Sequence, residues 1–268
     1  MITLTLKQQP VVPLEAENLS PDVLAPLTHD AIRALPVYHG KHQCRLDEFF
    51  DVDGEASDQL TVRGDCTKVK WLGRAMTRGK LTVQGHAGMH LGAFMKGGVI
   101  EVQGNASDWV GAEMSGGLIR VSGNAGGQVG AAYRGSMSGM KEGTILIGGS
   151  AGLEVGMRMK RGTIVIGGPV RDFAGLQMKG GTLFLLQGAE LRTGAWMIRG
   201  TIVSMKPLNL LPTFLPACTY RPSFLRLYTR FLRSLECPLP VGMHGGSYQR
   251  FTGDASVPGK GEVLVWQA

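Results

Sequence analysis

The chain has 268 residues with a formal net charge of +7, and 43% of its residues are hydrophobic while 18% are charged. This composition excludes an intrinsically disordered chain, and the 40 glycines exclude collagen because they follow no triplet period. The excess of cations predicts attraction to an anionic surface or ligand. No stretch has the 18 or more apolar residues of a membrane helix, and residues 1–15 lack the features of a signal peptide. We therefore expect a cytoplasmic protein that does not contact a membrane.

Residues 1–43 are expected to form an N-terminal cap. The segment begins with a strand at 2–6, continues through a proline-rich passage and contains a short helix near 28–35. The following stretch, RLDEFFDVDG at residues 45–54, is expected to open the repeat that comes next. Such a cap would protect the open end of a stack of strands from pairing with other chains.

Residues 44–205 contain one sequence motif seven times. The repeat contains a methionine, a glycine three residues later, and then two apolar residues separated by one position. Successive methionines are 19, 19, 26, 19, 19 and 19 residues apart, at Met76, Met95, Met114, Met140, Met159, Met178 and Met197. A second glycine ladder keeps the same spacing, at Gly73, Gly92, Gly111, Gly130, Gly156, Gly175 and Gly194. A fixed period of this length predicts one structural unit stacked on itself.

The repeated unit is predicted to be a coil of short strands. Its apolar pairs alternate with outward positions at a period of two, and segments such as GNAGGQVGA are too rich in glycine for a helix. The expected fold is all-β, a right-handed parallel β-helix with about 19 residues per coil and seven or eight coils. The methionines are expected to fill the interior, and a metal-binding methionine stripe is the alternative.

Two breaks interrupt the register. Leu60 and Leu81 are 21 residues apart, which places two extra residues near TKVKW. Gly130 and Gly156 are 26 residues apart, which places a seven-residue insert within AAYRGSMSGMK. We expect this insert to bulge from the coils and to offer Tyr133 and Arg134 to a partner, or else to be a tolerated surface loop.

Residues 206–268 are expected to form a C-terminal extension. RPSFLRLYTRFLRSLE reads as an amphipathic helix whose apolar stripe is Phe224, Leu227, Phe231 and Leu235. GEVLVWQ at 261–267 reads as a final strand. Together these elements would cover the second open end of the coils.

The residues show little sign of catalysis or metal binding. His86 and His90 are expected to bond to the backbone rather than to hold a metal, and the four cysteines have no metal-ligand spacing and are read as reduced thiols. Outward acids such as Glu101, Asp108 and Glu113 do not stack into a catalytic pair. We therefore expect no active site and no cofactor or metal bound by this chain alone.

Clustered lysines and arginines indicate a binding function more clearly than any residue pattern indicates catalysis. Lys141, Lys160 and Lys179 follow three successive ladder methionines, and stacking should bring their ammonium groups to about 5 Å from one another. Arg226, Arg230 and Arg233 share a face of the C-terminal helix. These six residues are predicted to bind an anionic ligand or an acidic partner, and a solvated face is the alternative. Nucleic acid is disfavoured because aromatic residues are not interleaved with the cations.

The phrases MKGGVIEVQGNASDWVGAEMSGG, GAAYRGSMSGM and RGTIVIGG resemble the C subunit of formylmethanofuran dehydrogenase, which is related to the glycine-repeat domain of glutamate synthase. LLPTF, TYRPSFLRLY and GKGEVLVWQ in the tail resemble the bacterial branch, in the formyltransferase/hydrolase complex of methylotrophs. The likeness runs from the first strand to about residue 205, and the tail extends it.

This resemblance implies a non-catalytic subunit of a cytoplasmic four-subunit complex that oxidises formaldehyde to formate. One partner transfers a formyl group from tetrahydromethanopterin to a methanofuran or methylofuran carrier, an amidohydrolase-like partner with metal ions releases formate, and a third resembles the B subunit of the dehydrogenase. The carrier bears a chain of glutamates, whose negative charges would pair with the predicted lysines and arginines. A tungsten or molybdenum dehydrogenase of the archaeal type and a glutamate-synthase-like structural domain are the alternatives.

Overall fold

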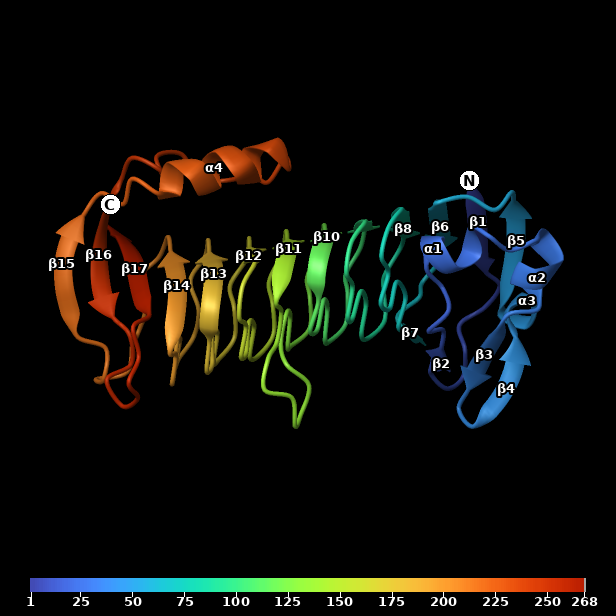
Figure 1. Ribbon diagram of the computed structural model, residues 1–268, viewed down its shortest axis with the longest axis horizontal. Coiled ribbons are helices and arrows are strands. Elements are labelled where there is room, and N and C mark those ends of the chain that lie inside the picture. Colours follow the sequence, from blue (N-terminus) through green and yellow to red (C-terminus); the bar gives the residue numbers. More distant parts are fainter. Residues whose placement is uncertain (268) are drawn as a thin grey trace.

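A computed structural model describes residues 1–267 of the chain. The molecule is elongated and consists mostly of strands, with a 13-stranded mixed sheet along its whole length and a four-stranded sheet at its N-terminal end (Figure 1). The prediction of an all-β chain is confirmed by this strand content. Within residues 1–267, no helix is both long and apolar enough to cross a membrane.

The strands of the 13-stranded sheet, in spatial order from the C-terminal end, are β15 (Pro216–Tyr220), β16 (Ser247–Thr252), β17 (Glu262–Gln267), β14 (Arg199–Ser204), β13 (Lys179–Leu185), β12 (Thr163–Ile166), β11 (Glu142–Ile147), β10 (Ser115–Val121), β9 (Val99–Val102), β8 (Lys80–Gln84), β6 (Gln59–Arg63), β1 (Ile2–Leu6) and β5 (Phe50–Gly54). The small sheet contains β4 (His42–Arg45), β3 (Pro36–His39), β2 (Leu14–Glu15) and β7 (Val69–Lys70). The helices are α1 (Pro21–Leu24), α2 (His29–Arg33), α3 (Leu46–Phe49) and α4 (Leu225–Ser234).

In the 13-stranded sheet, each neighbouring pair in the run β1, β6, β8, β9, β10, β11, β12, β13, β14 and β17 is parallel, and the register of the coils follows the repeat. Ile100 of β9 lies beside Ile119 of β10, and Ile119 lies beside Ile145 across the longer spacing. A second column of single bridges joins successive coils, as between Ala87 and Ala106. The chain therefore returns to the same position once per repeat, as the 19-residue period predicts.

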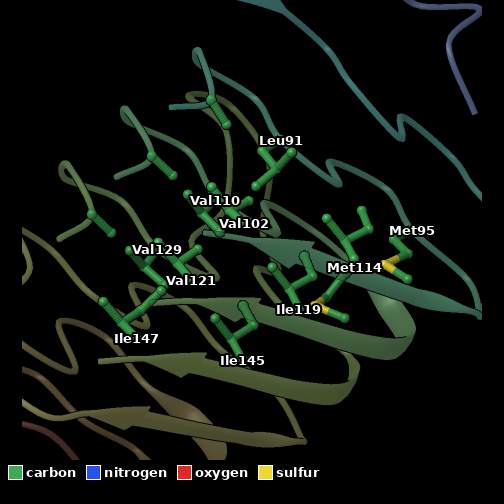
Figure 2. Packing of buried hydrophobic residues seen from close by; sticks show 14 of the residues in the cluster. Leu91, Met95, Val102, Val110, Met114, Ile119, Val121, Val129, Ile145 and Ile147 are labelled. Carbon is green, nitrogen blue, oxygen red and sulfur yellow. The ribbon is translucent and has the colours of Figure 1, made fainter. Parts of the chain in front are cut away.

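Three columns of apolar side chains fill the interior of the coils. The ladder methionines are fully buried, as are the paired aliphatic residues of the strands (Figure 2). A third column, which contains Leu91, Val110 and Val129, faces them from the opposite wall. The prediction that methionine fills the interior is confirmed, since the sulfur of Met114 and its terminal methyl group lie among the side chains of neighbouring coils.

The second glycine ladder marks a corner with left-handed backbone. Gly111 has a φ of 62°, and the residues two positions before and after it, Trp109 and Glu113, have φ values of 68° and 54°. The same alternation recurs in the other coils, except that only the first two of its three positions, Gln128 and Gly130, have a positive φ where the insert begins. At the middle position, glycine leaves room for the aliphatic column, because a Cβ on Gly111 would lie 2.6 Å from the end of the Ile145 side chain.

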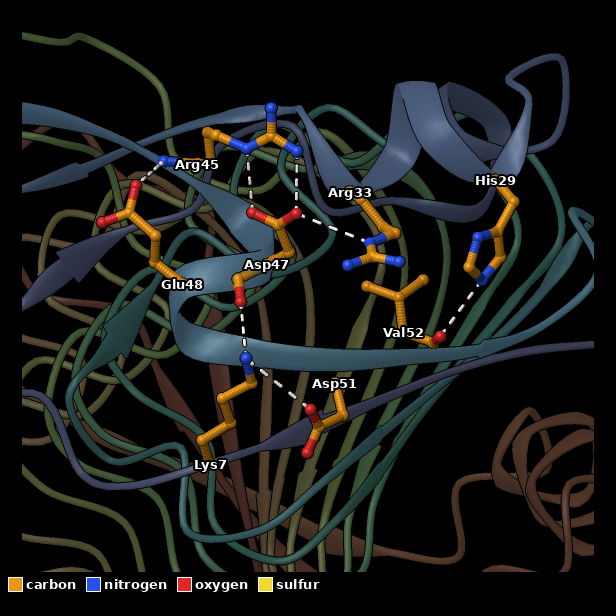
Figure 3. A network of polar contacts seen from close by, with 8 residues as sticks. All are labelled: Lys7, His29, Arg33, Arg45, Asp47, Glu48, Asp51 and Val52. Carbon is orange, nitrogen blue, oxygen red and sulfur yellow. Dashed lines mark hydrogen bonds and ion pairs between the residues drawn. The ribbon is translucent and has the colours of Figure 1, made fainter.

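The N-terminal end differs from its prediction. Residues 45–54 do not form a coil of the parallel stack, because they make α3 and then β5, which pairs antiparallel with β1. Polar contacts tie these elements together (Figure 3). Arg45 binds Asp47 through two hydrogen bonds of 2.8 and 3.0 Å, and Lys7 bonds to the Asp47 carbonyl. The hydrogen bond from Arg45 lowers the pKa of Asp47 to about 2.

The C-terminal end is closed by antiparallel strands and covered on one side by α4. The final strand is confirmed as β17, which pairs in parallel with β14 and antiparallel with β16. α4 lies along the outer face of the sheet, where Leu225 and Leu232 pack against outward side chains of the last coils (Figure 1). These outward side chains are Leu146, Val165, Phe184, Val203 and Leu264.

The predicted apolar stripe of the helix is wrong in two of its four members. Leu227 is 72% exposed and Phe231 is 45% exposed, whereas Leu225, Thr229 and Leu232 are buried. The helix is rotated from the expected face because Tyr228 also turns inward, where its hydroxyl group hydrogen-bonds to that of Thr182 at 2.8 Å. Two large apolar side chains are consequently left on its solvent side.

Candidate binding surface

The three predicted lysines lie together on the coils. Each follows a ladder methionine, and its backbone N–H donates to the carbonyl of the methionine one coil earlier, at 2.7 to 2.8 Å for Lys141, Lys160 and Lys179. They line one open hollow of about 600 Å³, which we call the lysine hollow, together with Arg161 and Arg199. The spacing of the repeat therefore correctly predicted that these side chains would gather.

The lysine hollow carries charge that the chain itself does not neutralise. Within residues 1–267, none of its five cations has a carboxylate oxygen within 4.0 Å. Lys179 has a neutral partner instead, since its ammonium group donates to the carbonyl of Met137 at 2.6 Å. Five cations in one hollow favour an anionic occupant, because each bound carboxylate lowers their mutual repulsion.

The three predicted arginines form a second, separate group. Arg226, Arg230 and Arg233 lie on α4 and line an open hollow of about 530 Å³ with Thr229 and His244. This hollow shares no lining residue with the lysine hollow. The six predicted residues therefore make two cationic surfaces rather than one.

The insert contacts coils on both sides of its own position. Toward the N-terminus, Tyr133 is half-buried and stacks on Trp109 with 4.7 Å between ring centroids, and its hydroxyl group bonds to Nδ1 of His90 at 2.8 Å. His90 in turn stacks on Trp71 at 4.1 Å. The insert was expected to offer both Tyr133 and Arg134 to a partner. Tyr133 instead packs against earlier coils, whereas Arg134 is exposed as predicted.

Toward the C-terminus, the insert is held by two cations of the following coils. The guanidinium of Arg158 donates to the Ser136 carbonyl at 2.7 Å, and Lys179 donates to the next carbonyl, that of Met137. Sequence reasoning missed these contacts, although the aromatic residues under Tyr133 were visible as a 19-residue spacing of Trp71, His90 and Trp109. The insert is consequently a fixed part of the surface.

The histidines and acids that could suggest chemistry have structural partners. Nδ1 of His86 accepts from the Asn105 N–H at 2.9 Å, as expected for backbone bonding. The same expectation is wrong for His90, whose Nδ1 bonds to the side-chain hydroxyl group of Tyr133 instead. Glu101 pairs with Lys80 at 2.7 Å, and Glu113 accepts from the Tyr133 N–H at 3.0 Å. Across residues 1–267, no three His, Cys, Asp or Glu side chains are arranged to hold a metal ion.

Burial also disfavours the charged forms of several titratable groups. The pKa of the Cys66 thiol is raised to about 12 because burial disfavours the thiolate. Burial likewise raises the pKa of Tyr133 and lowers the pKa of His90. All four cysteines are free thiols in the structure. What the arrangement offers is a rigid surface with two groups of cations.

Comparison with known proteins defines the family. Residues 63–208, more than half of the chain, match the family described as the GXGXG motif. The chain belongs to the GXGXG family. The GXGXG segment covers the coils from the end of β6 to the end of the stack, including the lysine hollow and the insert beside it.

Curated relatives of this GXGXG chain are the C subunits of formylmethanofuran dehydrogenases, which confirms the resemblance. The C subunit of the tungsten-containing enzyme 2 of Methanothermobacter thermautotrophicus is 41% identical over 97 residues, or 34% of this chain and 36% of that protein. The C subunit of the molybdenum-containing enzyme 1 of the same organism is 43% identical over 83 residues, or 30% of this chain and 21% of that protein. The match thus spans little more than a third of these relatives at most.

A solved structure matches the GXGXG chain over nearly its whole length. It is the crystal structure of the formyltransferase/hydrolase complex FhcABCD from Methylorubrum extorquens in complex with methylofuran. The two chains are 30% identical and superpose with a TM-score of 0.92, covering 99% of this chain and 100% of the other. The likeness therefore includes the N-terminal cap and the C-terminal extension as well as the coils.

Proposed function

We propose that the chain is a subunit of a cytoplasmic formyltransferase/hydrolase complex in one-carbon metabolism. This complex would pass a formyl group from tetrahydromethanopterin to a methanofuran-type carrier and release formate during formaldehyde oxidation. The observation that carries the proposal is the superposition on a chain of such a complex over 99% of the present chain. A shared fold over the caps as well as the coils favours the same assembly role.

The proposed role of this chain is structural rather than catalytic. The coils form a long, closely packed body, and His86, Glu101 and Glu113 are engaged in bonds within the chain. A formyltransferase subunit, an amidohydrolase-like subunit that holds the metal ions and a dehydrogenase-B-like subunit would be its partners. We further propose that the coils wind as a right-handed β-helix over residues 44–205, flanked by a cap (1–43) and an extension (206–268).

A tungsten- or molybdenum-containing dehydrogenase of the archaeal type is the second candidate. It is favoured by the identities of 41% and 43% to the C subunits of those enzymes. These matches cover at most 34% of the chain, whereas the formyltransferase/hydrolase neighbour extends through α4 and β17. The bacterial type is therefore ranked first. A free-standing glutamate-synthase-like domain is ranked last, since it would not explain the extensive match of both ends.

We also propose that the lysine hollow binds the acidic tail of the carrier or an acidic partner, and that the arginine group on α4 serves the same purpose. The support is electrostatic, because Lys141, Lys160 and Lys179 share a hollow that contains no carboxylate among its lining residues. A chain of glutamates would place one negative charge near each ammonium group.

The carrier hypothesis predicts weaker retention when these charges are removed. Replacing Lys141, Lys160 and Lys179 together by Ala should lower carrier retention by the assembled complex about tenfold, with a smaller dependence of the remaining affinity on salt. The measurement is quantitative mass spectrometry of carrier bound after washes of rising ionic strength. Lys96→Ala is the matched control, since Lys96 follows a ladder methionine but lies outside the hollow. Unchanged retention in the triple variant contradicts the hypothesis.

A further inference from the structure

Three large apolar side chains are exposed together where the insert meets the last coils. Met137 is 67% exposed, Trp196 is 49% exposed and Ile198 is 40% exposed. They line one open hollow of about 480 Å³, which we call the tryptophan hollow, with Arg158 and Lys179 beside them. Exposed tryptophan and methionine next to arginine are the residue types enriched in protein–protein interfaces.

The walls of the tryptophan hollow are fixed by hydrogen bonds before any partner arrives. Arg158 and Lys179 hold the insert through the carbonyls of Ser136 and Met137, and Arg158 also donates to Gln177 at 2.7 Å. On the opposite side, the backbone N–H of Trp196 donates to a carboxylate oxygen of Asp254 at 2.7 Å. A preformed surface loses little conformational entropy on binding, which favours its use for docking.

Charge decides what kind of group can cover this surface. Within the described chain, Arg158 and Lys179 have hydrogen bonds only to neutral oxygens and no carboxylate within 4.0 Å. An apolar group that covers Trp196 would take these two cations out of water, which is unfavourable unless negative charges arrive with it. The occupant must therefore bring both an apolar side chain and carboxylates.

The tryptophan hollow continues into the lysine hollow, because Lys179 lines both. Both hollows are open to solvent rather than enclosed, which suits a segment of a protein better than a small molecule that needs most of its surface buried. We propose that this combined surface docks an acidic segment of another subunit, with a large apolar side chain of that segment on Trp196 and its carboxylates over Lys179, Lys160 and Lys141. The inference rests on the proposed membership of a hetero-oligomer. Of the two occupants proposed for the lysine hollow, it takes the acidic partner instead of the carrier tail, and it adds the surface and the chemistry of that contact.

The first test is Trp196→Ala in the full chain, assembled with the other subunits of the complex. Ala75 occupies the same position of an earlier coil with a φ of 54°, against 56° for Trp196, so the backbone accepts alanine there. The dissociation constant of the chain from the rest of the complex should rise at least tenfold, as for other central tryptophans of interfaces. Leu191→Ala, at a residue that is 48% exposed outside both hollows, should change it less than twofold.

The second test identifies the occupant. A photo-reactive phenylalanine derivative replaces Met137 in the assembled complex, and the cross-linked peptide is sequenced. The proposal expects a segment of another subunit that contains several Asp or Glu residues and a large apolar residue. Cross-links to the carrier, to this chain alone or to a segment without acidic residues overturn it.

The two proposals fail in different ways. A complex that assembles with unchanged affinity after Trp196→Ala leaves the proposed function standing and overturns the docking surface. A wild-type chain that binds none of the expected subunits overturns both.

Discussion

At the scale of single residues, the coils depend on glycines that let one turn of chain approach the next. A Cβ on Gly116 would lie 2.3 Å from the backbone carbonyl oxygen of Lys96 in the preceding coil, and a backbone atom cannot rotate away. Gly245, in contrast, has no atom within 4 Å of such a position. The regular spacing of glycine within this sequence thus reflects contact between coils as well as turning of the chain.

Gly116→Ala should lower the free energy of unfolding by about 1 to 3 kcal/mol, the usual effect of overpacking. The matched control Gly245→Ala should lie within about 0.5 kcal/mol of the original chain. Chemical denaturation of the purified proteins provides the measurement. Equal stabilities of the two variants would show that the coils are farther apart than described.

His90 gives the chain a predictable response to acid. Its pKa in the folded chain is lowered, chiefly because burial disfavours the charged imidazole and secondly because Lys70 is near. The unfolded chain takes up this proton near its ordinary pKa of about 6.5, so below that value the unfolded state binds more protons and stability falls until the folded pKa is passed.

Replacing His90 by Gln should therefore reduce the loss of stability between about pH 7.5 and pH 5.5. Gln128 occupies the same corner position with a φ of 58°, close to the 64° of His90, so the backbone accepts the change. Thermal unfolding at both pH values measures the effect, with His42→Gln at an exposed strand position as the control. An unchanged pH slope in His90→Gln would contradict the described burial of the ring.

At the scale of elements, α4 is stabilised by the outer face of the sheet, against which Leu225 and Leu232 pack. The outward positions of the strands are polar in the early coils, with Thr82, Glu101 and Arg120, and become apolar from Leu146 onward. α4 packs where this change occurs. The helix therefore covers one face of the last coils, and its Leu227 and Phe231 side chains are exposed.

Leu232→Ala should destabilise the chain by about 2 to 4 kcal/mol, because a fully buried side chain leaves a cavity against the sheet. Leu227→Ala removes the same number of atoms from an exposed position and should change stability by less than about 0.5 kcal/mol. Hydrogen exchange of α4 together with denaturation distinguishes local from global loss. A larger effect at Leu227 than at Leu232 would contradict the described packing of α4 and support the apolar stripe predicted from periodicity alone.

At the scale of the whole molecule, repetition made most of the fold predictable. The ladder of Met95 and its counterparts specified the strands, their parallel register and their buried faces, because every coil obeys the same packing rule. Residues 45–54 and α4 were harder, since each occurs once and its partner surface lies far away in the sequence. The change from Arg120 to Leu146 at outward positions could have located α4, had outward positions been compared coil by coil.

The candidate site was predictable to the extent that it repeats. Lys141, Lys160 and Lys179 stack because they occupy equivalent positions, and the sequence shows this directly. The tryptophan hollow was not predictable, because it joins Met137 of the insert to Trp196 across several coils. Only the folded arrangement brings an unrepeated segment against a repeated one.

The central claim is that this chain functions as one subunit of a formyltransferase/hydrolase complex. The most direct measurement is affinity purification of the tagged chain from its native cells, followed by native mass spectrometry and metal analysis of the eluate. The account predicts an assembly of four different chains, with formyltransferase and amidohydrolase-like subunits and without tungsten or molybdenum. A chain that elutes alone, or with unrelated proteins, would contradict it.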